Sequence, residues 1–151
     1  MNKTHLKEFY QRLNRHHDEL RWLYMELYNN GSMFYELMER LQEFYIQRSE
    51  DLKTIDRSRE ADPSWYKRND LLGMMLYIDN FAGNLQGVKE KISYLEQANV
   101  NYIHLMPFLD TVPGRSDGGY AVKDFRKVQP QLGTMEDLEE LTAACHDKGI
   151  Q

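Results

Sequence analysis

The chain has 151 residues, of which 41% are hydrophobic, a formal net charge of −5 and a single cysteine. These values exclude an intrinsically disordered chain and favour one folded domain, or one small domain joined to part of another. Lys and Arg form no continuous stripe, so we expect no nucleic-acid partner, and Cys145 alone excludes an internal disulfide. The sequence shows neither a signal peptide nor an apolar run of about 18 residues, which predicts a cytoplasmic protein without a membrane partner.

Two amphipathic helices are the first predicted elements. In "HLKEFYQRLNRHHDELRWLYMELY" the apolar residues recur at spacings of three, four and seven, which is typical of one helix face, and "MFYELMERLQEFYIQRSEDL" repeats the pattern. Between them, Gly31 is expected to adopt a left-handed conformation and Ser32 to cap the second helix. The short turn predicts an antiparallel helical hairpin. Its expected core face consists of Leu6, Phe9, Leu13, Leu20, Leu23, Leu27, Phe34, Leu37, Met38, Leu41, Phe44 and Tyr45.

A connection between two modules is predicted around "DRSREADPSWYKRND", residues 56–70. Asp62 precedes Pro63, which disfavours continued helix, and Trp65 and Tyr66 are expected to pack the connection down. We therefore assign residues 1–62 to a helical N-terminal domain, residues 63–71 to a linker and residues 72–151 to a second module.

Strand and helix patterns alternate in the second module. "LGMMLYIDNFAG" is a short β-prone run, "NLQGVKEKISYLEQANV" has helical spacing, and "NYIHLMP" is a second candidate for a buried strand. A loop containing Gly and Pro follows. "GTMEDLEELTAACHDKGI" then begins a helix, with Thr134 and Asp137 placed as a capping box. This order predicts βα units and a parallel sheet.

Residues 149–151 are expected to begin a third strand. Two parallel strands cannot bury both of their faces, and a (β/α)8 barrel takes about 250 residues. The second module therefore predicts the first βα units of a truncated (β/α)8 TIM barrel, as the front of a longer protein. A small complete α/β domain is the alternative.

Three motifs carry a resemblance to a known family. "HLMPF", "DGGYAV" and "QLGTMEDL" stand in an order and at a spacing that resemble the start of the catalytic barrel of glycoside hydrolase family 13. The doubled glycine after Asp117, and the helical front with "EADPSWY", most resemble the amylosucrase branch. The resemblance covers essentially the whole chain and implies a retaining α-glucosyl transferase or hydrolase acting on sucrose or α-glucans. In the retaining route one carboxylate attacks the anomeric carbon and a second carboxylic acid, about 5 Å away, protonates the leaving oxygen.

The same resemblance places two substrate-binding residues in "SDGGYAVKDF". Tyr120 is implied to form the aromatic platform under the transferred glucosyl ring, and Asp117 to accept hydrogen bonds from its hydroxyls. Gly118 and Gly119 are expected to give the loop conformations that turn both side chains inward. Asp124 is expected to hold the loop through backbone hydrogen bonds. An ordinary Asp-Gly-Gly turn with a packing tyrosine is the alternative.

No catalytic residue is expected in the chain itself. In the resembling family the nucleophile, the general acid and an Asn-His motif come from strands after the one that begins at Gln151, so the chain alone is predicted to be inactive. No metal or organic cofactor is suggested. Asp79 is expected to be a buried carboxylate that accepts backbone N–H groups, and His104 to be a packed residue of a buried strand.

Two other functions stay open. One is another family 13 enzyme, of the α-amylase or trehalose-forming type. The other is a non-catalytic helical interaction module followed by a barrel remnant. The sequence does not determine the oligomeric state.

Overall fold

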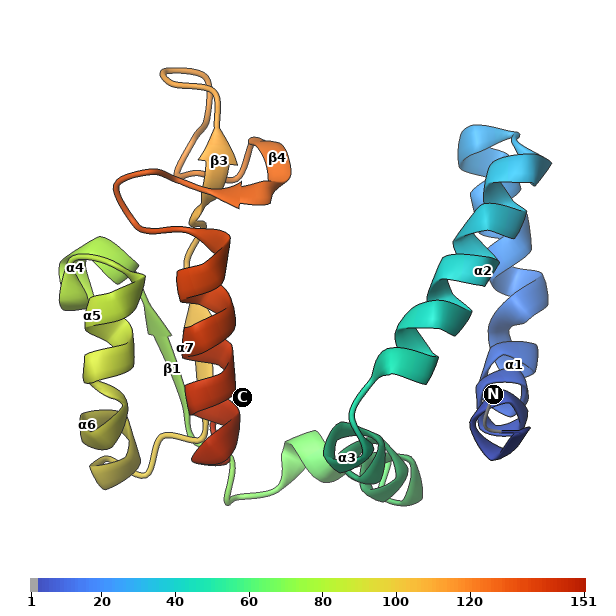
Figure 1. Ribbon diagram of the computed structural model, residues 1–151, viewed down its shortest axis with the longest axis horizontal. Helices are drawn as coiled ribbons and strands as arrows, with labels where there is room; N and C mark the ends of the chain where they lie inside the picture. The colour runs from blue at the N-terminus through green and yellow to red at the C-terminus, as the bar shows by residue number, and fades with distance from the viewer. Residues whose placement is uncertain (1–2) are drawn as a thin grey trace. The chain divides into compact units, whose positions relative to one another are not determined.

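The computed structural model describes residues 3–151 and contains two compact units, Met1–Pro63 and Ser64–Gln151 (Figure 1). The first unit consists of helices and turns, and the second combines strands with helices. Within residues 3–151, no helix combines the length and the apolarity that crossing a membrane requires. The predicted order, a helical segment followed by βα units, is confirmed.

In the first unit, α1 (Lys3–Tyr28) and α2 (Gly31–Gln47) pack against each other as the predicted hairpin (Figure 1). The predicted turn chemistry is wrong, because two asparagines take the roles given to Gly31 and Ser32. Asn29 has the positive φ of 45°, and the side-chain oxygen of Asn30 accepts the backbone N–H of Met33 at 3.2 Å. A short carboxamide can both tolerate the left-handed region and reach the first helical N–H groups.

A third helix, α3 (Glu50–Ala61), occupies part of the expected connection. Ser49 interrupts the second predicted helix and caps the third, since its hydroxyl accepts the N–H of Leu52 at 3.4 Å. Acidic residues in the first turn favour a helix start at this point. The prediction that the connection begins at residue 56 is therefore wrong, because α3 continues to Ala61 and ends only where Asp62 precedes Pro63.

The core of the helical unit is smaller than the apolar pattern predicts. Phe9 and Phe34 are buried. Two long helices and one short one bury only the line along which they touch, so the outer parts of the predicted face stay in contact with solvent. The members of that face that are exposed are Leu23, Leu27, Leu41 and Phe44.

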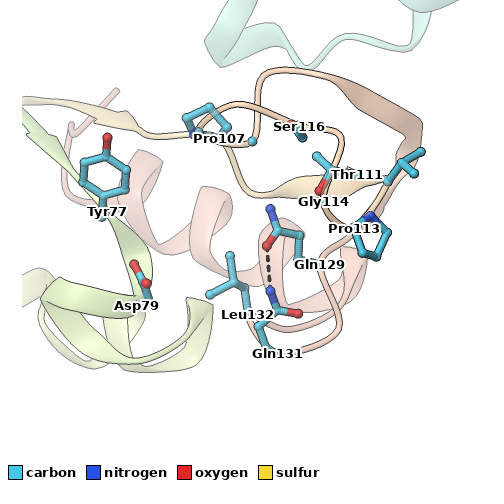
Figure 2. A pocket seen from close by; sticks show the side chains of 13 residues that line it. Tyr77, Asp79, Pro107, Thr111, Pro113, Gly114, Ser116, Gln129, Gln131 and Leu132 are labelled. Atoms are coloured by element: carbon cyan, nitrogen blue, oxygen red, sulfur yellow. Dashed lines mark hydrogen bonds between the residues drawn. The ribbon is translucent and has the colours of Figure 1, made fainter.

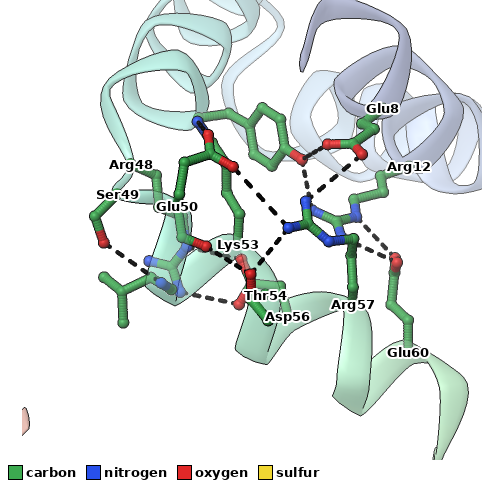
Figure 3. A network of polar contacts seen from close by, with 12 residues as sticks. Glu8, Arg12, Arg48, Ser49, Glu50, Lys53, Thr54, Asp56, Arg57 and Glu60 are labelled. Atoms are coloured by element: carbon green, nitrogen blue, oxygen red, sulfur yellow. Dashed lines mark hydrogen bonds and ion pairs between the residues drawn. The ribbon is translucent and has the colours of Figure 1, made fainter. Parts of the chain in front are cut away.

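A polar network joins the three helices (Figure 3). The guanidinium of Arg12 donates two bonds to Glu60, at 2.9 and 3.0 Å, and a third to the hydroxyl of Tyr45 at 3.0 Å. Tyr45 in turn donates to Glu8 at 2.9 Å. The bond to Glu60 raises the pKa of Arg12, and burial, followed by the bond to Glu8, raises the pKa of Tyr45. Paired charges therefore contribute to the cohesion of this unit, whose apolar core is small.

The second unit contains the predicted parallel strand pair. β1 (Gly73–Leu76) pairs with β2 (Tyr102–Leu105) in the register Gly73↔Tyr102 to Leu76↔Leu105. The connection between them contains α4 (Ile78–Ala82), α5 (Leu85–Glu90) and α6 (Ile92–Gln97), and α7 (Met135–Asp147) packs against α5. A short 3-10 helix, η1 (Trp65–Lys67), precedes β1. The buried core is formed by Leu76, Ile78, Leu85, Val88, Ile92, Leu95, Val100, Val128, Leu132, Leu141, Cys145 and Ile150.

Within residues 64–151, the helices of the second unit cover one face of the sheet. Met75 is 69% exposed, and its register partner His104 is also exposed, so the prediction of a packed His104 in a buried strand is wrong. At the edge of β2, the N–H of Ile103 donates to the carbonyl of Gln151 at 2.7 Å, and the N–H of Gln151 donates to Asn101 at 3.0 Å. These two bonds have the pattern of a parallel neighbour of β2, although residues 149–151 are not themselves assigned as a strand, so the predicted third strand stays a prediction.

One hairpin was not predicted. β3 (Leu109–Thr111) and β4 (Val122–Val128) pair antiparallel with irregular register, inside the region interpreted as a loop. β3 has three residues, and β4 (VKDFRKV) has little of the apolar alternation that predicts a strand, in keeping with side chains that are mostly exposed or half-buried. The N–H of Gln129 donates to the carbonyl of Phe108 at 2.9 Å and ties the base of the hairpin to the segment that follows β2.

Candidate functional site

A hollow of about 320 Å³ lies where the parallel strands end (Figure 2). Tyr77 and Asp79 follow β1, and Pro107 follows β2, so the hollow is at the carboxyl edge of the sheet. In α/β barrels this edge is the one at which active sites are built. Its other walls come from the β3–β4 hairpin and the residues after it: Thr111, Val112, Pro113, Gly114, Ser116, Gly118, Gly119, Gln129, Gln131 and Leu132.

The stretch "SDGGYAVKDF" forms a tight turn beside this hollow. The N–H of Tyr120 donates to the carbonyl of Asp117 at 3.2 Å, and the two central residues, Gly118 and Gly119, have φ values of 58° and 86°. Positive φ at both central positions is the pattern of a type I′ turn, which favours glycine. The hydroxyl of Ser116 accepts the N–H of Ala121 at 2.9 Å. This bond joins the residue before the turn to the residue after it.

The two residues assigned to sugar binding by resemblance lie on the surface of this turn. Tyr120 is 68% exposed and Asp117 is exposed. Neither is among the described residues that line the hollow, although Gly118 and Gly119 between them are. The structure therefore brings the turn to the expected edge of the sheet but does not direct the Asp117 and Tyr120 side chains into the hollow.

Asp124 lies in β4 rather than in a loop. Its carboxylate accepts the backbone N–H of Arg126 at 2.9 Å and lies 3.4 Å from the ammonium of Lys127. The backbone bond, more than the ion pair, lowers the pKa of Asp124. The contacts of this carboxylate are therefore with its own strand and not with the hollow.

Asp79 differs most from the expectation. It is exposed in the first turn of α4 and lines the hollow, so the prediction of a buried carboxylate is wrong. The chain leaves β1 one residue before α4, which puts Asp79 on a surface helix instead of in the sheet. Three further lining residues, Tyr77, Gln129 and Gln131, were missed by sequence reasoning. The position of Tyr77 directly after a strand was the one available signal.

Within residues 3–151, no group of three or more His, Cys, Asp or Glu side chains is arranged to hold a metal ion. The hollow therefore offers hydroxyl, amide, carboxylate and aromatic groups as its chemistry.

Comparison with protein families matches residues 56–151 to the alpha-amylase family, described as "Alpha amylase, catalytic domain". The matched segment includes the entire second unit and therefore the hollow and the Asp117–Tyr120 turn.

Curated proteins similar to the chain have several different descriptions. Trehalose synthase/amylase TreS of Mycobacterium tuberculosis is 38% identical over 96 residues, which are 60% of this chain and 16% of that protein. Alpha-amylase SusG of Bacteroides thetaiotaomicron is 42% identical over 105 residues, 65% of this chain and 13% of that protein. The human amino acid transporter heavy chain SLC3A1 is 41% identical over 69 residues, 46% of this chain and 10% of that protein. The chain thus spans about a sixth of these relatives or less.

The solved structures that are similar to the chain also have different descriptions. Trehalose-6-phosphate hydrolase TreA of Bacillus licheniformis matches with a TM-score of 0.51 at 28% identity, over 58% of this chain and 16% of that one. A structure described as a family GH13_31 enzyme matches with a TM-score of 0.50 at 30% identity, over 58% and 17% of the two chains. These likenesses support the barrel-type arrangement of the βα units, and they do not select one substrate.

Proposed function

The chain belongs to the alpha-amylase family, and from that premise we propose that it supplies part of the sugar-binding face of a retaining α-glucosyl transferase or hydrolase. One observation carries the proposal. The Gly118–Gly119 turn presents Asp117 and Tyr120 at the carboxyl edge of a parallel sheet. That turn lies within the segment matched to the family.

The exposed side chains of the turn suit a sugar. With 68% of its surface open, Tyr120 can pack its ring against the C–H face of a glucosyl unit and offer its phenol to a hydroxyl. Asp117 can accept hydrogen bonds from two neighbouring hydroxyls, and bonds to a charged acceptor are stronger than neutral ones. The turn therefore holds and orients the glucosyl unit, while the nucleophile and the general acid of the retaining route come from elsewhere.

The donor that we favour is sucrose, as in the amylosucrase branch. The support is the "DGGYAV" motif together with the helical front, whose three helices form a compact unit. A trehalose-forming or trehalose-cleaving enzyme is the second candidate, and the similarity to a trehalose synthase and to a trehalose-6-phosphate hydrolase favours it. The similarity to a transporter heavy chain keeps a non-catalytic role as an outcome to be tested.

The first experiment is to sequence the source DNA downstream of the codon for Gln151. If the frame continues, the encoded protein is purified and assayed for fructose release from sucrose and for glucose release from trehalose and starch. Fructose release above the other activities supports the sucrose proposal, and dominant action on trehalose supports the second candidate. A protein that binds sugars and turns over none of the three overturns the enzymatic proposal, as does an immediate stop codon.

Variants then test the turn. We expect Tyr120→Ala and Asp117→Asn each to lower kcat/KM about tenfold or more, because each removes roughly 1.5 kcal/mol of contact with the glucosyl unit. Phe125→Ala is the matched control, since Phe125 is an exposed aromatic residue on β4 outside the turn. If the control loses as much activity as Tyr120→Ala, the turn has no special role.

A further inference from the structure

A pocket of about 200 Å³ lies between α1 and α3 in the helical unit. The α1 residues that line it stand three, four and seven positions after Glu8, and the two α3 residues are three positions apart, so each helix contributes one face. The described lining residues are all polar or charged: Glu8, Gln11, Arg12, Arg15, Arg57 and Glu60. The pocket is therefore distinct from the apolar core of this unit and suits a polar ligand.

Arg12 and Glu60 satisfy each other within this pocket (Figure 3). The guanidinium of Arg12 donates to both carboxylate oxygens of Glu60, at 2.9 and 3.0 Å, and its third bond goes to Tyr45. A bidentate pair of this kind has strong and directed hydrogen bonds. The charges of the pair largely cancel, so the charge that a ligand meets comes from the other side chains of the pocket.

Arg15 and Arg57 are held less closely. Arg15 lies 3.7 Å from Glu60, and Arg57 lies 3.6 Å from Glu8. Both separations are longer than an N–H···O hydrogen bond, which extends to about 3.2 Å. Arg57 also donates to Thr54 at 3.0 Å, but a guanidinium has several N–H donors. With 63% and 42% of their side-chain surface exposed, Arg15 and Arg57 can offer N–H groups to a ligand.

The pocket has an excess of positive charge. Its described lining contains three arginines and two glutamates, which leaves one positive charge. Two further carboxylates belong to α3, and each has a cation of its own. Glu50 lies 4.0 Å from Arg57 but 3.2 Å from the ammonium of Lys53. Asp56 accepts two bonds from Arg48, at 2.7 and 2.9 Å. The excess charge therefore favours an anionic ligand.

The donors of the pocket come from two helices. Gln11 and Arg15 are on α1, and Arg57 is on α3. A carboxylate has two oxygens and is matched by one guanidinium, whereas a phosphate group has enough oxygens to accept from more than one. The volume is below the roughly 300–1,000 Å³ that is typical of drug-sized ligands. These features fit one phosphate group better than a carboxylate or a large ligand.

We propose that the pocket between α1 and α3 binds a phosphate group, which accepts hydrogen bonds from Arg15, Arg57 and the side-chain amide of Gln11. The ligand replaces the long contacts of the two arginines with Glu60 and Glu8, and it bridges the first and third helices. The inference concerns the helical unit and does not depend on the sugar chemistry proposed for the second unit.

The test is a titration of the ¹⁵N-labelled 151-residue chain with sodium phosphate, at an ionic strength held constant with sodium chloride. We expect saturable shifts of the side-chain Nε–H signals of Arg15 and Arg57. Arg15→Gln should weaken phosphate binding about tenfold, because it removes a charged donor at an exposed position. Arg21→Gln is the matched control, since it removes the same charge from an exposed position of α1 outside the pocket.

Glu8→Gln distinguishes a binding site from a structural ion-pair network. It removes a carboxylate that competes with the ligand for Arg57, so phosphate binding should become about threefold tighter. An arginine that serves only to pair with Glu8 would give no such gain. Weaker binding of phosphate by this variant would contradict the proposal.

Two further probes define the ligand. Acetate should bind at least about tenfold more weakly than phosphate, because it offers fewer oxygens. Glucose 1-phosphate identifies the source of the group: binding as tight as that of inorganic phosphate supports a phosphorylated metabolite, and clearly weaker binding supports the free ion. Equal binding of acetate and phosphate would overturn the proposal. So would an equal weakening of phosphate binding in Arg15→Gln and Arg21→Gln, or the absence of saturable shifts at Arg15 and Arg57.

Discussion

Gly119 and Pro107 are in direct contact at the point where the glycine turn meets the end of β2. A Cβ atom on Gly119 would lie 2.8 Å from the Cβ of Pro107 and 3.4 Å from its carbonyl oxygen. Gly119 also has a φ of 86°. Two separate features therefore require glycine at this position: the positive φ of the backbone and the close approach of Pro107. The close approach also fixes the turn against the edge of the sheet.

Gly119→Ala is accordingly expected to destabilise the second unit more than a left-handed backbone alone explains. The conformational part costs about 1–2 kcal/mol, and the clash with Pro107 adds about 1–3 kcal/mol. Gly114→Ala is the matched control, because Gly114 has a φ of 71° and a Cβ there meets no described atom within 4 Å. Urea unfolding of both variants measures the difference. Equal losses would show that the contact with Pro107 contributes nothing.

The sequence predicts the parts of this fold whose signals are local. The capping box of Thr134 and Asp137 is confirmed, with the threonine hydroxyl accepting the N–H of Asp137 at 3.2 Å and the carboxylate accepting the N–H of Thr134 at 2.8 Å. The strands at β1 and β2 are confirmed in place and in parallel direction. The two residues of the capping box lie three positions apart, and each of the two strands is a run of four consecutive residues.

The missed features depend on partners distant in sequence or on competing local chemistry. Ser32 has a good capping side chain, but Asn30 is placed one residue before Gly31 and takes the cap. The hollow combines Asp79 after β1 with Gln129 after β4, which are 50 positions apart, and no spacing rule joins them. The exposure of His104 depends on which face of the sheet the helices cover.

Lys53 provides a test of the helical unit. It is 1% exposed, and its ammonium lies 3.2 Å from Glu50 and donates to the carbonyl of Ile46 at 3.3 Å. Lys53→Ala should destabilise the unit by about 1–3 kcal/mol, since it removes packing and leaves polar partners without their donor. Lys53→Met keeps the packing of the side-chain stem, so its loss should be clearly smaller.

Thermal unfolding of the Lys53 variants checks this expectation, with Lys7→Ala on the exposed surface of α1 as the control. The control should change the free energy of unfolding by about 0.5 kcal/mol or less. If Lys53→Met costs as much as Lys53→Ala, the charge and its bonds stabilise the unit more than the packing does.

Cys145 is expected to resist thiol reagents while the chain is folded. It is buried in the core between α7 and the sheet, and burial raises the pKa of its thiol. The thiol therefore has a higher pKa in the folded chain than in the unfolded chain. Its contribution to the stability of the fold is fully present below the unfolded pKa and is lost as pH rises through the folded pKa.

The measurement is the rate of reaction with a disulfide reagent at mildly alkaline pH, for the folded chain and for the same chain in urea. We expect the folded chain to react at least about tenfold more slowly, because the attacking species is the thiolate. Similar rates in the two states would show that the core around α7 opens readily.

The capping box at the start of α7 should contribute measurably to the second unit. Thr134→Ala removes the oxygen that accepts the N–H of Asp137, and we expect a loss of about 1 kcal/mol. Thr142→Ala on the same helix is the matched control, since its exposed hydroxyl donates to the carbonyl of Leu138 at 2.8 Å, a carbonyl within the helix. That variant should change stability by about 0.5 kcal/mol or less. Urea unfolding followed by circular dichroism measures the free energy of unfolding of both variants. Equal losses of stability would mean that Thr134 contributes no more through the capping box than Thr142 contributes within the helix.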